Sequence, residues 1–385
     1  MENVASCCRK RGSILKRTSP RVVVIGTRGY PSYYGGFETA VRHIAPHLAD
    51  EGWEVVVYSR KDLRSETSEF DGRVLTPVTR GVESKALSTL SYGLSSTIHA
   101  LVRGADVALV MNVANGFWLP LLRLRGIPVV MNVDGIEWER AKWGRVAKIV
   151  FRVGARLSAL FANTLIVDAA AIGRYWSARF RRESVFIPYG ADEAPIAAVP
   201  LGLTSRTYVL LVARFVPENT VAEFFAAVPA ISEQHDVVIV GSTGYGGRFD
   251  EEAQALASAH SRVRWLGHVS DDRLLHGLWQ HAGVYFHGHS VGGTNPALVQ
   301  AMMLGAPIVA RDTVYNREVL GDDATFAEPD SNSIANNVIA LMNDPDRQTT
   351  ESEASMARAK ERYTWRKVND AYNKVLSGEL RGRSR

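Results

Sequence analysis

Two glycine-rich segments are the first candidates for a chemical role, because bare backbone amides can bind an anion. The first segment, Gly26–Thr39, places Gly35 and Gly36 at the expected start of a helix. Its spacing matches neither the dinucleotide-binding GxGxxG pattern nor the P-loop. Paired glycines there let a ligand approach the amides and the positive end of the helix dipole. A tight turn that needs positive φ is the alternative explanation.

The second segment, His287–Gly305, carries a sharper pattern. Gly292 and Gly293 follow an apolar run, and Asn295 and Pro296 are preferred N-cap and first residues of a helix. The amides from Gly293 onward are predicted to point at the carboxyl end of the strand, where a diphosphate or sugar hydroxyls could bind. A structural cap explains Asn295 and Pro296 but not the glycines before them.

Three charged residues lie at or after predicted strand ends. Arg214 suits phosphate oxygens, with an interdomain salt bridge as the alternative. Asp134 can accept a hydroxyl proton or bind a sugar hydroxyl, although an Asp-Gly pair is also an ordinary turn. Glu318 is a candidate for hydroxyl binding, or else a solvated helix acid. His287 and His289 are expected to pack, because a metal would need further ligands.

Short apolar runs alternate with helical patterns, which predicts parallel sheets covered by helices. The strands expected in the first half are Arg21–Gly26, Glu54–Tyr58, Val74–Val78, Val107–Met111, Val129–Asn132, Thr164–Val167 and Ser184–Ile187. In the second half they are Tyr208–Ala213, Val237–Gly241, Val263–Leu266, Val284–His287 and Pro307–Ala310, with a helix over Glu218–Ile231. We predict the α/β class, with two doubly wound Rossmann-like domains facing each other across a cleft.

The same pattern suggests how the chain is divided. Residues 1–20 are expected to form a disordered basic tail, with Arg9, Lys10, Arg11, Lys16 and Arg17 against Glu2. The N-terminal domain is predicted over 21–190, a proline-containing linker over 191–206 and the C-terminal domain over 207–362. Residues 363–385 are expected to form a helix, near Trp365–Leu376, that crosses back to the N-terminal domain and ends in a basic tail.

Composition narrows the class of protein. The 385 residues are 46% hydrophobic and 22% charged, which is the ordinary globular mix. No stretch reaches about 18 uncharged apolar residues, which argues against an integral membrane protein. The two cysteines, Cys7 and Cys8, exclude a disulfide scaffold, and the lack of core cysteine pairs suits the cytoplasm. A pI near 9.2 permits a polyanion or an anionic membrane as partner.

One predicted helix, Arg145–Phe161, suggests a peripheral contact with the inner face of the plasma membrane. Its basic residues form one stripe, consisting of Arg145, Lys148, Arg152 and Arg156. Its apolar residues are Val146, Ile149, Val150, Val153, Leu157 and Leu160, and we expect them to cover the sheet. Only the cationic face would then be left to attract anionic lipid.

Five collinear segments resemble the family 4 glycosyltransferases, which are retaining enzymes of the GT-B fold. They are RGYPSYYGGFET from Arg28, NVDGIEWERAKWG from Asn132, ARFVPEN from Ala213, GHSVGGTNPALVQAM from Gly288 and VYNREVLG from Val314. The resemblance spans about Arg21 to Leu376 and is closest to a bacterial subgroup labelled rhamnosyltransferase-like.

This resemblance implies a sugar nucleotide held by the second domain and a saccharide or lipid-linked acceptor held by the first, with no nucleic acid as partner. Arg214 would bind the diphosphate, and Gly293, Thr294 and Asn295 would contact the diphosphate or the donor sugar. No metal or other cofactor is expected, because protein cations and helix dipoles would neutralise the leaving diphosphate. The DxD string at Asp344–Asp346 is interpreted as chance.

Two departures from the family pattern point to the donor. The family usually has two glutamates eight positions apart, where this chain has Gly292 and Gln300, and a frequent lysine is replaced by Asn219. Gln300 can still bond a ribose hydroxyl, whereas the change at Gly292 removes a contact to a hexose hydroxyl. These changes favour dTDP-rhamnose as donor, in surface-polysaccharide or cell-wall synthesis. The alternatives are a GT-B nucleotide-sugar epimerase and an inactive sugar-nucleotide or polysaccharide binder.

Overall fold

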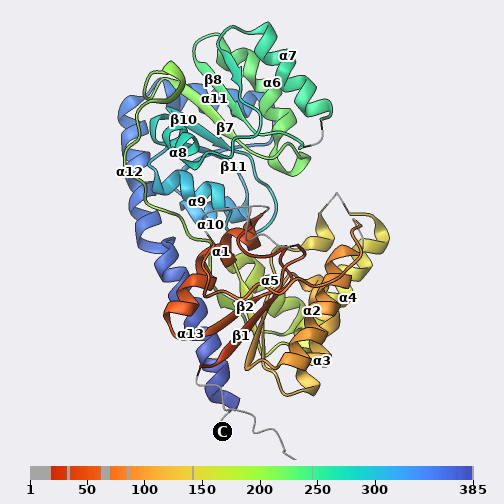
Figure 1. Cartoon of the computed structure of the whole chain (residues 1–385). Helices are drawn as coiled ribbons and strands as arrows, with labels where there is room; N and C mark the ends of the chain where they lie inside the picture. The colour runs from red at the N-terminus through yellow and green to blue at the C-terminus, as the bar shows by residue number, and fades with distance from the viewer. Residues whose placement is uncertain are drawn as a thin grey trace, which may run out of the picture.

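Two parallel six-stranded sheets organise the chain, each covered by helices on both faces (Figure 1). The computed structural model describes residues 19–32, 35–61, 70–84, 87–140, 143–244 and 246–383. Of the predicted tail over residues 1–20, residues 1–18 therefore lie outside the described residues. The predicted α/β class with two Rossmann-like domains is confirmed.

The first sheet has the strand order β2-β1-β3-β4-β5-β6. Most of its strand residues are fully buried, as expected for β-branched runs covered on both faces. Its strands are β1 (Arg21–Ile25), β2 (Glu54–Val57), β3 (Val107–Met111), β4 (Val129–Asn132), β5 (Thr164–Val167) and β6 (Val185–Phe186). Its helices are α1 (Gly36–Asp50), α2 (Ser88–Arg103), α3 (Leu119–Leu124), α4 (Arg145–Phe161) and α5 (Ala170–Phe180).

The second sheet has the order β12-β11-β10-β7-β8-β9. Its strands are β7 (Tyr208–Val212), β8 (Asp236–Val240), β9 (Val263–Trp265), β10 (Val284–His287), β11 (Ile308–Arg311) and β12 (Thr325–Ala327). The helices of this half are α6 (Val221–Ser232), α7 (Arg248–Ala259), α8 (Asp272–His281), α9 (Pro296–Met303), α10 (Val314–Leu320), α11 (Ser331–Met342) and α12 (Pro345–Arg362).

Two predicted elements differ from the structure. The segment Val74–Val78 makes only isolated bridges, from Leu75 and Val78, and is not a strand of the sheet. The helix expected from Glu218 begins at Val221, because a 3-10 turn precedes it and Thr220 has a left-handed φ of 56°. The second difference lies at an element boundary, where local sequence patterns are least decisive.

The last helix, α13 (Trp365–Arg383), returns from the second domain to the first (Figure 1). The Trp53 Nε1 donates to Asn373 Oδ1 at 2.9 Å, and Asn132 Nδ2 donates to the Tyr372 hydroxyl at 2.7 Å. At the crossing, the Ala191 amide donates to the Tyr363 carbonyl at 2.7 Å. The two segments that connect the domains are therefore hydrogen-bonded to each other.

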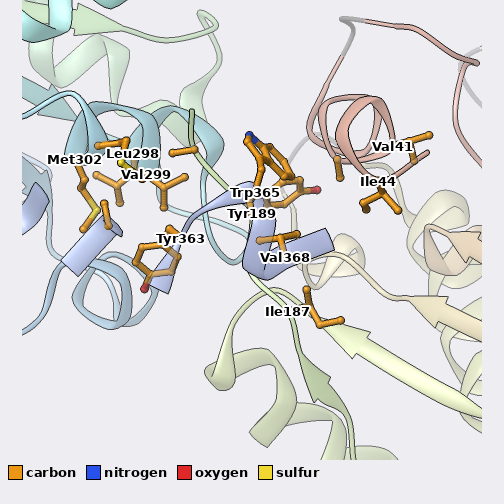
Figure 2. Packing of buried hydrophobic residues seen from close by; sticks show 14 of the residues in the cluster. Val41, Ile44, Ile187, Tyr189, Leu298, Val299, Met302, Tyr363, Trp365 and Val368 are labelled. Carbon is orange, nitrogen blue, oxygen red and sulfur yellow. The ribbon is translucent and has the colours of Figure 1, made fainter. Parts of the chain in front are cut away.

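A continuous apolar cluster joins the two domains at this crossing. Figure 2 shows Tyr189 and Trp365 between Val41 of α1 and Val299 of α9. The Trp365 ring also stacks on His43 of α1, with ring centroids 4.0 Å apart. The crossing segments around Tyr189 and Trp365, which form the hinge between the domains, are therefore part of a buried core.

Helix α4 has the predicted bounds, but the predicted face does not cover the sheet. Its buried residues are Phe151, Gly154, Ala155, Ser158 and Ala159. Small residues face inward because the helix lies close to the turn at residues 113–118, where Gly116 and Gly154 leave no room for a side chain on either. The expectation that the larger apolar residues cover the sheet is therefore wrong.

Candidate active site between the two domains

The candidate site lies where both sheets reverse their strand order. In the first sheet β1 lies beside β3, and in the second β7 lies beside β10, so the winding direction changes at these pairs. Ligands of doubly wound sheets bind outside the carboxyl ends of the strands at such points. The segments that follow β4 and β5 in one domain contact those that follow β10 and β11 in the other.

Neither residue of the first glycine pair has a strained backbone, and close packing explains Gly36 alone. Gly35 is extended, with φ −171°, and Gly36 begins α1, so neither has positive φ. A Cβ on Gly36 would lie 2.8 Å from the hydroxyl oxygen of Tyr189. The Glu38 carboxylate accepts from the Arg28 amide at 3.0 Å and steadies the preceding loop. The turn explanation is thus wrong for this pair, and ligand approach stays a prediction.

Asp134 lies at the contact between the domains. It has a left-handed φ of 59°, and its amide donates to Asn132 Oδ1 at 3.1 Å, which is the turn considered for an Asp-Gly pair. The following glycine, Gly135, packs so closely on the other domain that a Cβ there would lie 2.9 Å from the Cα of Gly292. The carboxylate therefore sits on a turn that touches the second glycine segment, and its chemical role stays a prediction.

Asp168 is a second acid at this contact, and it was missed by the sequence analysis. It follows β5 directly, and its residue is only 3% exposed. Among the described residues its Oδ1 has no hydrogen-bond partner. Burial and the carboxylate of Asp134 raise the pKa of Asp168 well above its ordinary value, while Arg140 opposes that rise. The strand-end rule that selected Asp134 would have found Asp168.

Positive charge from both domains gathers around His289. Burial and the nearby guanidinium groups of Arg140, Arg214 and Arg311 lower the pKa of His289 to about 3. The neutral ring donates from Nδ1 to Asn219 Oδ1 at 2.6 Å. His289 therefore packs as expected, and the charges of Arg140 from the first domain and of Arg214 and Arg311 from the second converge near it. Such convergence suits the two negative charges of a diphosphate.

The second glycine segment caps α9 as predicted but uses part of its amides internally. Asn295 Oδ1 accepts from the Ala297 amide at 2.9 Å. The Thr294 amide and hydroxyl both donate to the Asp168 carbonyl in the other domain. The Gly292 and Gly293 amides, in contrast, donate to no group within the described residues. Two of the predicted amides are therefore engaged, and those of the glycine pair are available to an anion.

Gln300 and Glu318 both contact the chain outside their own domain core. The side-chain amide of Gln300 accepts from the Asp192 amide at 2.9 Å and donates to the Asp192 carbonyl at 2.8 Å. The Glu318 carboxylate accepts from the amides of Ala170 and Ala171 at the start of α5. Gln300 thus connects the second domain to the linker, and Glu318 connects it to the first domain. Hydroxyl binding by either residue stays a prediction.

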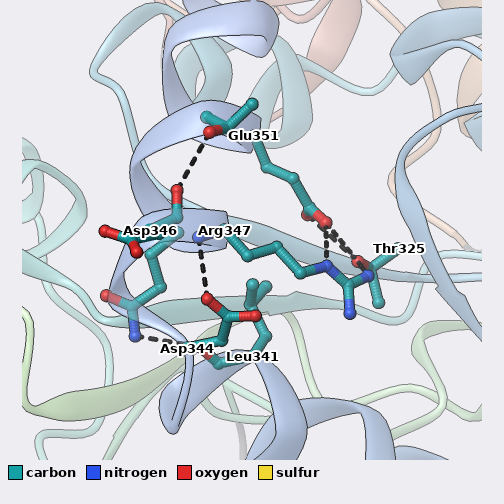
Figure 3. Close-up of polar contacts among 8 residues, drawn as sticks. Thr325, Leu341, Asp344, Asp346, Arg347 and Glu351 are labelled. Atoms are coloured by element: carbon teal, nitrogen blue, oxygen red, sulfur yellow. Dashed lines mark hydrogen bonds and ion pairs between the residues drawn. The ribbon is translucent and has the colours of Figure 1, made fainter.

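The DxD string has a structural role. Asp344 Oδ1 accepts from the Arg347 amide at 3.0 Å and caps α12, and Arg347 pairs with Glu351 at 2.7 Å (Figure 3). Across the part of the chain that the structure describes, no three His, Cys, Asp or Glu side chains converge to hold a metal ion. Metal-independent chemistry remains a prediction.

Both domains match glycosyltransferase family models. Residues 35–190 match the model described as "Glycosyl transferase 4-like domain", and residues 206–344 match "Glycosyl transferases group 1". The two matches together cover most of the chain. No curated protein sequence matches it. The chain is therefore a two-domain glycosyltransferase, and it belongs to the family 4 type.

Solved structures share this fold across nearly the whole chain. Sucrose-phosphate synthase from Thermosynechococcus elongatus has a TM-score of 0.79 at 17% identity, covering 94% of this chain and 100% of that one. Anabaena HepE in complex with UDP has a TM-score of 0.71 at 17% identity, covering 93% and 100%. TarM of S. aureus with UDP, fondaparinux and α-GlcNAc-glycerol has a TM-score of 0.71 at 10% identity, covering 93% and 99%. These likenesses establish the GT-B fold.

Proposed function

We propose that this glycosyltransferase moves rhamnose from dTDP-rhamnose to a saccharide or lipid-linked acceptor, with retention of the anomeric configuration, in bacterial surface-polysaccharide or cell-wall synthesis. The observation that carries the proposal is the meeting of opposite charges at the contact between the domains. Arg214 and Arg311 of the second domain and Arg140 of the first lie near His289, and the glycine segment beside His289 packs on the turn of Asp134 and on the carboxyl group of Asp168. The arginines and the amides of Gly292 and Gly293 suit a leaving diphosphate, and the carboxyl groups suit a hydroxyl-bearing substrate.

The roles that we assign to individual residues follow from this arrangement of charges. Arg214, with Arg140 and Arg311, stabilises the diphosphate as negative charge develops on it, and the glycine amides add hydrogen bonds. Asp134 binds or polarises the reacting hydroxyl from the first domain. HepE was solved with UDP, and TarM with UDP and saccharides, which supports a sugar nucleotide and an acceptor as the partners here.

The choice of rhamnose rests on Gly292. This residue has φ 94°, so a glutamate at this position would have a strained backbone, although its Cβ would make only ordinary contacts with Arg140 and His289. The site therefore lacks a carboxylate at the position where the family commonly contacts a hexose hydroxyl. A 6-deoxy sugar, which presents a methyl group in place of one hydroxyl, is consistent with that loss.

A panel of sugar nucleotides tests the proposal. The melting temperature should rise most with dTDP-rhamnose, compared with UDP-glucose, UDP-GlcNAc and GDP-mannose, because a ligand of the native state stabilises it by mass action. Release of dTDP should accompany the shift when a saccharide acceptor is added. A larger shift with UDP-glucose would contradict the donor assignment. If the protein binds the sugar nucleotide saturably but releases no nucleotide with any acceptor tested, it is an inactive binding protein.

We also propose that the enzyme works at an anionic membrane surface through α4. Val146, Ile149 and Leu160 are 76%, 57% and 73% exposed, so apolar side chains stand beside the exposed Arg152 and Arg156. This combination is typical of a helix that lies in a lipid interface. Helices α2, α3 and α4 contain no aspartate or glutamate. Within the described residues, no helix is both long and apolar enough to cross a membrane.

A further inference from the structure

A small pocket beside α4 carries three arginines and is separate from the proposed donor site. It has a volume of about 250 Å³ and lies between α4, α5 and the 3-10 turn Glu137–Glu139. Arg152 and Arg156 come from α4, and Arg179 comes from the last turn of α5. The pocket thus joins elements that are distant in sequence.

The three guanidinium groups have no ion-pair or hydrogen-bond partner among the described residues. The Arg179 guanidinium lies over the ring of Phe180, 5.9 Å from its centroid, and keeps its hydrogen-bond donors available. The pocket is also lined by Glu139, so its three arginines and one glutamate give a net charge of +2. Arginine presents a planar set of donors that matches the oxygens of a phosphoryl group. The chemistry of the pocket therefore favours a phosphoryl anion.

The remaining walls of the pocket are aromatic side chains that pack against one another. Trp138 is buried, and its Nε1 donates to the Tyr175 hydroxyl at 3.3 Å. The ring of Phe180 lies at a right angle to Trp138, with centroids 6.4 Å apart. These contacts give the pocket a rigid floor. At about 250 Å³ it is smaller than the roughly 300–1,000 Å³ of sites that enclose a whole small-molecule ligand, and it suits a compact head group.

The exposed surface of α4 continues from the pocket in both directions. Ile149, Arg152, Arg156 and Leu160 follow one another at spacings that keep them on one face, and all four are exposed. A lipid whose phosphoryl group bound the two arginines would therefore have Ile149 and Leu160 on either side of its head group, where both can contact the apolar region of the bilayer. A free phosphate compound would make no use of these apolar neighbours.

We infer that Arg152, Arg156 and Arg179 form a specific binding site for the phosphoryl head group of a membrane lipid. This inference rests on the proposed membrane contact of α4 and gives that contact a defined point of attachment. It differs from diffuse attraction, in which every basic residue near an anionic surface contributes about equally, at about 1 kcal/mol each.

Two double variants of the same helix separate the two kinds of attraction. Arg152→Gln with Arg156→Gln removes two charges from the pocket, and Arg145→Gln with Lys148→Gln removes two charges outside it. Co-sedimentation is measured with phosphatidylcholine vesicles that contain phosphatidic acid, at low salt and at about 1 M salt, where the Debye length falls to about 3 Å. We expect the pocket variant to lose about tenfold or more of the high-salt binding, and the control variant to keep it. Equal losses in both variants, or no vesicle binding at low salt, would overturn the site.

The source of the phosphoryl group is decided by the apolar flank. Ile149→Gln with Leu160→Gln should weaken vesicle binding while both arginines remain. If inorganic phosphate at millimolar concentration displaces the vesicles and the flank variant binds normally, the pocket takes a free phosphate compound and the lipid assignment is wrong. Far-ultraviolet circular dichroism confirms folding of each variant. The donor-induced melting shift is measured in parallel, so a failure of the sugar-transfer proposal is recognised separately.

Discussion

The carboxyl group of Asp168 lies directly against Gly293 of the opposite domain. A Cβ on Gly293 would overlap the Oδ1 of Asp168, and the next residue, Thr294, donates to the Asp168 carbonyl. The acid of one domain and the glycine segment of the other are therefore fitted to each other without room for a methyl group. We therefore expect closure of the two domains to depend on this fit.

Gly293→Ala should obstruct domain closure while leaving each domain folded. Overpacking of a close contact costs about 1–3 kcal/mol, and here the domains can relieve it by separating. We expect a larger radius of gyration in small-angle X-ray scattering and a weaker affinity for the donor. Gly378→Ala in α13, where an added Cβ meets open space, is the matched control. An unchanged radius and unchanged donor affinity would show that the contact does not govern closure.

Arg214→Ala should weaken donor binding by about 1.5–3 kcal/mol, which is the range for a lost hydrogen bond to a charged group. Isothermal calorimetry with the sugar nucleotide measures the change. Arg248→Ala removes a charge from the same domain on an exposed helix and should have little effect. A folded Arg214→Ala variant that binds the donor normally would remove this residue from the diphosphate site.

Asp134→Asn should lower kcat by about 10²–10⁴-fold and leave donor affinity nearly unchanged, because a positioned acid or base contributes on this scale. Asparagine also tolerates the left-handed φ of 59° at this turn, so the substitution changes the charge and not the backbone. Steady-state kinetics and calorimetry on the same preparation check both statements. Normal turnover would leave Asp134 as a turn residue alone.

Asp168→Asn should change how stability depends on pH. Because the pKa of Asp168 is raised in the folded protein, the folded state binds more protons than the unfolded state between about pH 3.9 and the raised value. Stability of the native protein is therefore expected to fall as pH rises through that window, by about 1.4 kcal/mol for each pH unit. Asparagine does not ionise, so urea unfolding of the variant should lack this decline. Parallel pH profiles for the two proteins would contradict the assignment.

Gln300→Glu tests why this chain departs from the family glutamate. The side-chain amide donates to the Asp192 carbonyl, and a carboxylate would place an unpaired acceptor against that oxygen. We expect a loss of about 0.5–1.5 kcal/mol in the free energy of unfolding, the usual net value of one hydrogen bond. Gln254→Glu, on exposed α7, is the control for the charge change. A more stable Gln300→Glu variant would show that the linker contact is not the reason for glutamine.

Local sequence determined the elements and the order of the candidate loops. Strands such as β3 and helices such as α1 follow from apolar periodicity, which depends on neighbouring residues. Because parallel strands share their carboxyl edge, the positions of Asp134, Arg214 and Gly293 at strand ends also followed from the sequence. The five family segments then indicated the class of enzyme, which the two family models support.

Tertiary structure alone decided which of these residues meet. Asp168 and Gly293 are 125 positions apart, and Gln300 binds a linker residue 108 positions away. No periodicity encodes such contacts, because they depend on how two separately folded sheets are placed by the hinge around Tyr189 and Trp365. Tertiary structure also decided which face of α4 is buried, because its amphipathic pattern is compatible with burial of either of two faces. Close packing against Gly116 selected the small residues, and so left Ile149 and Leu160 exposed beside the arginines.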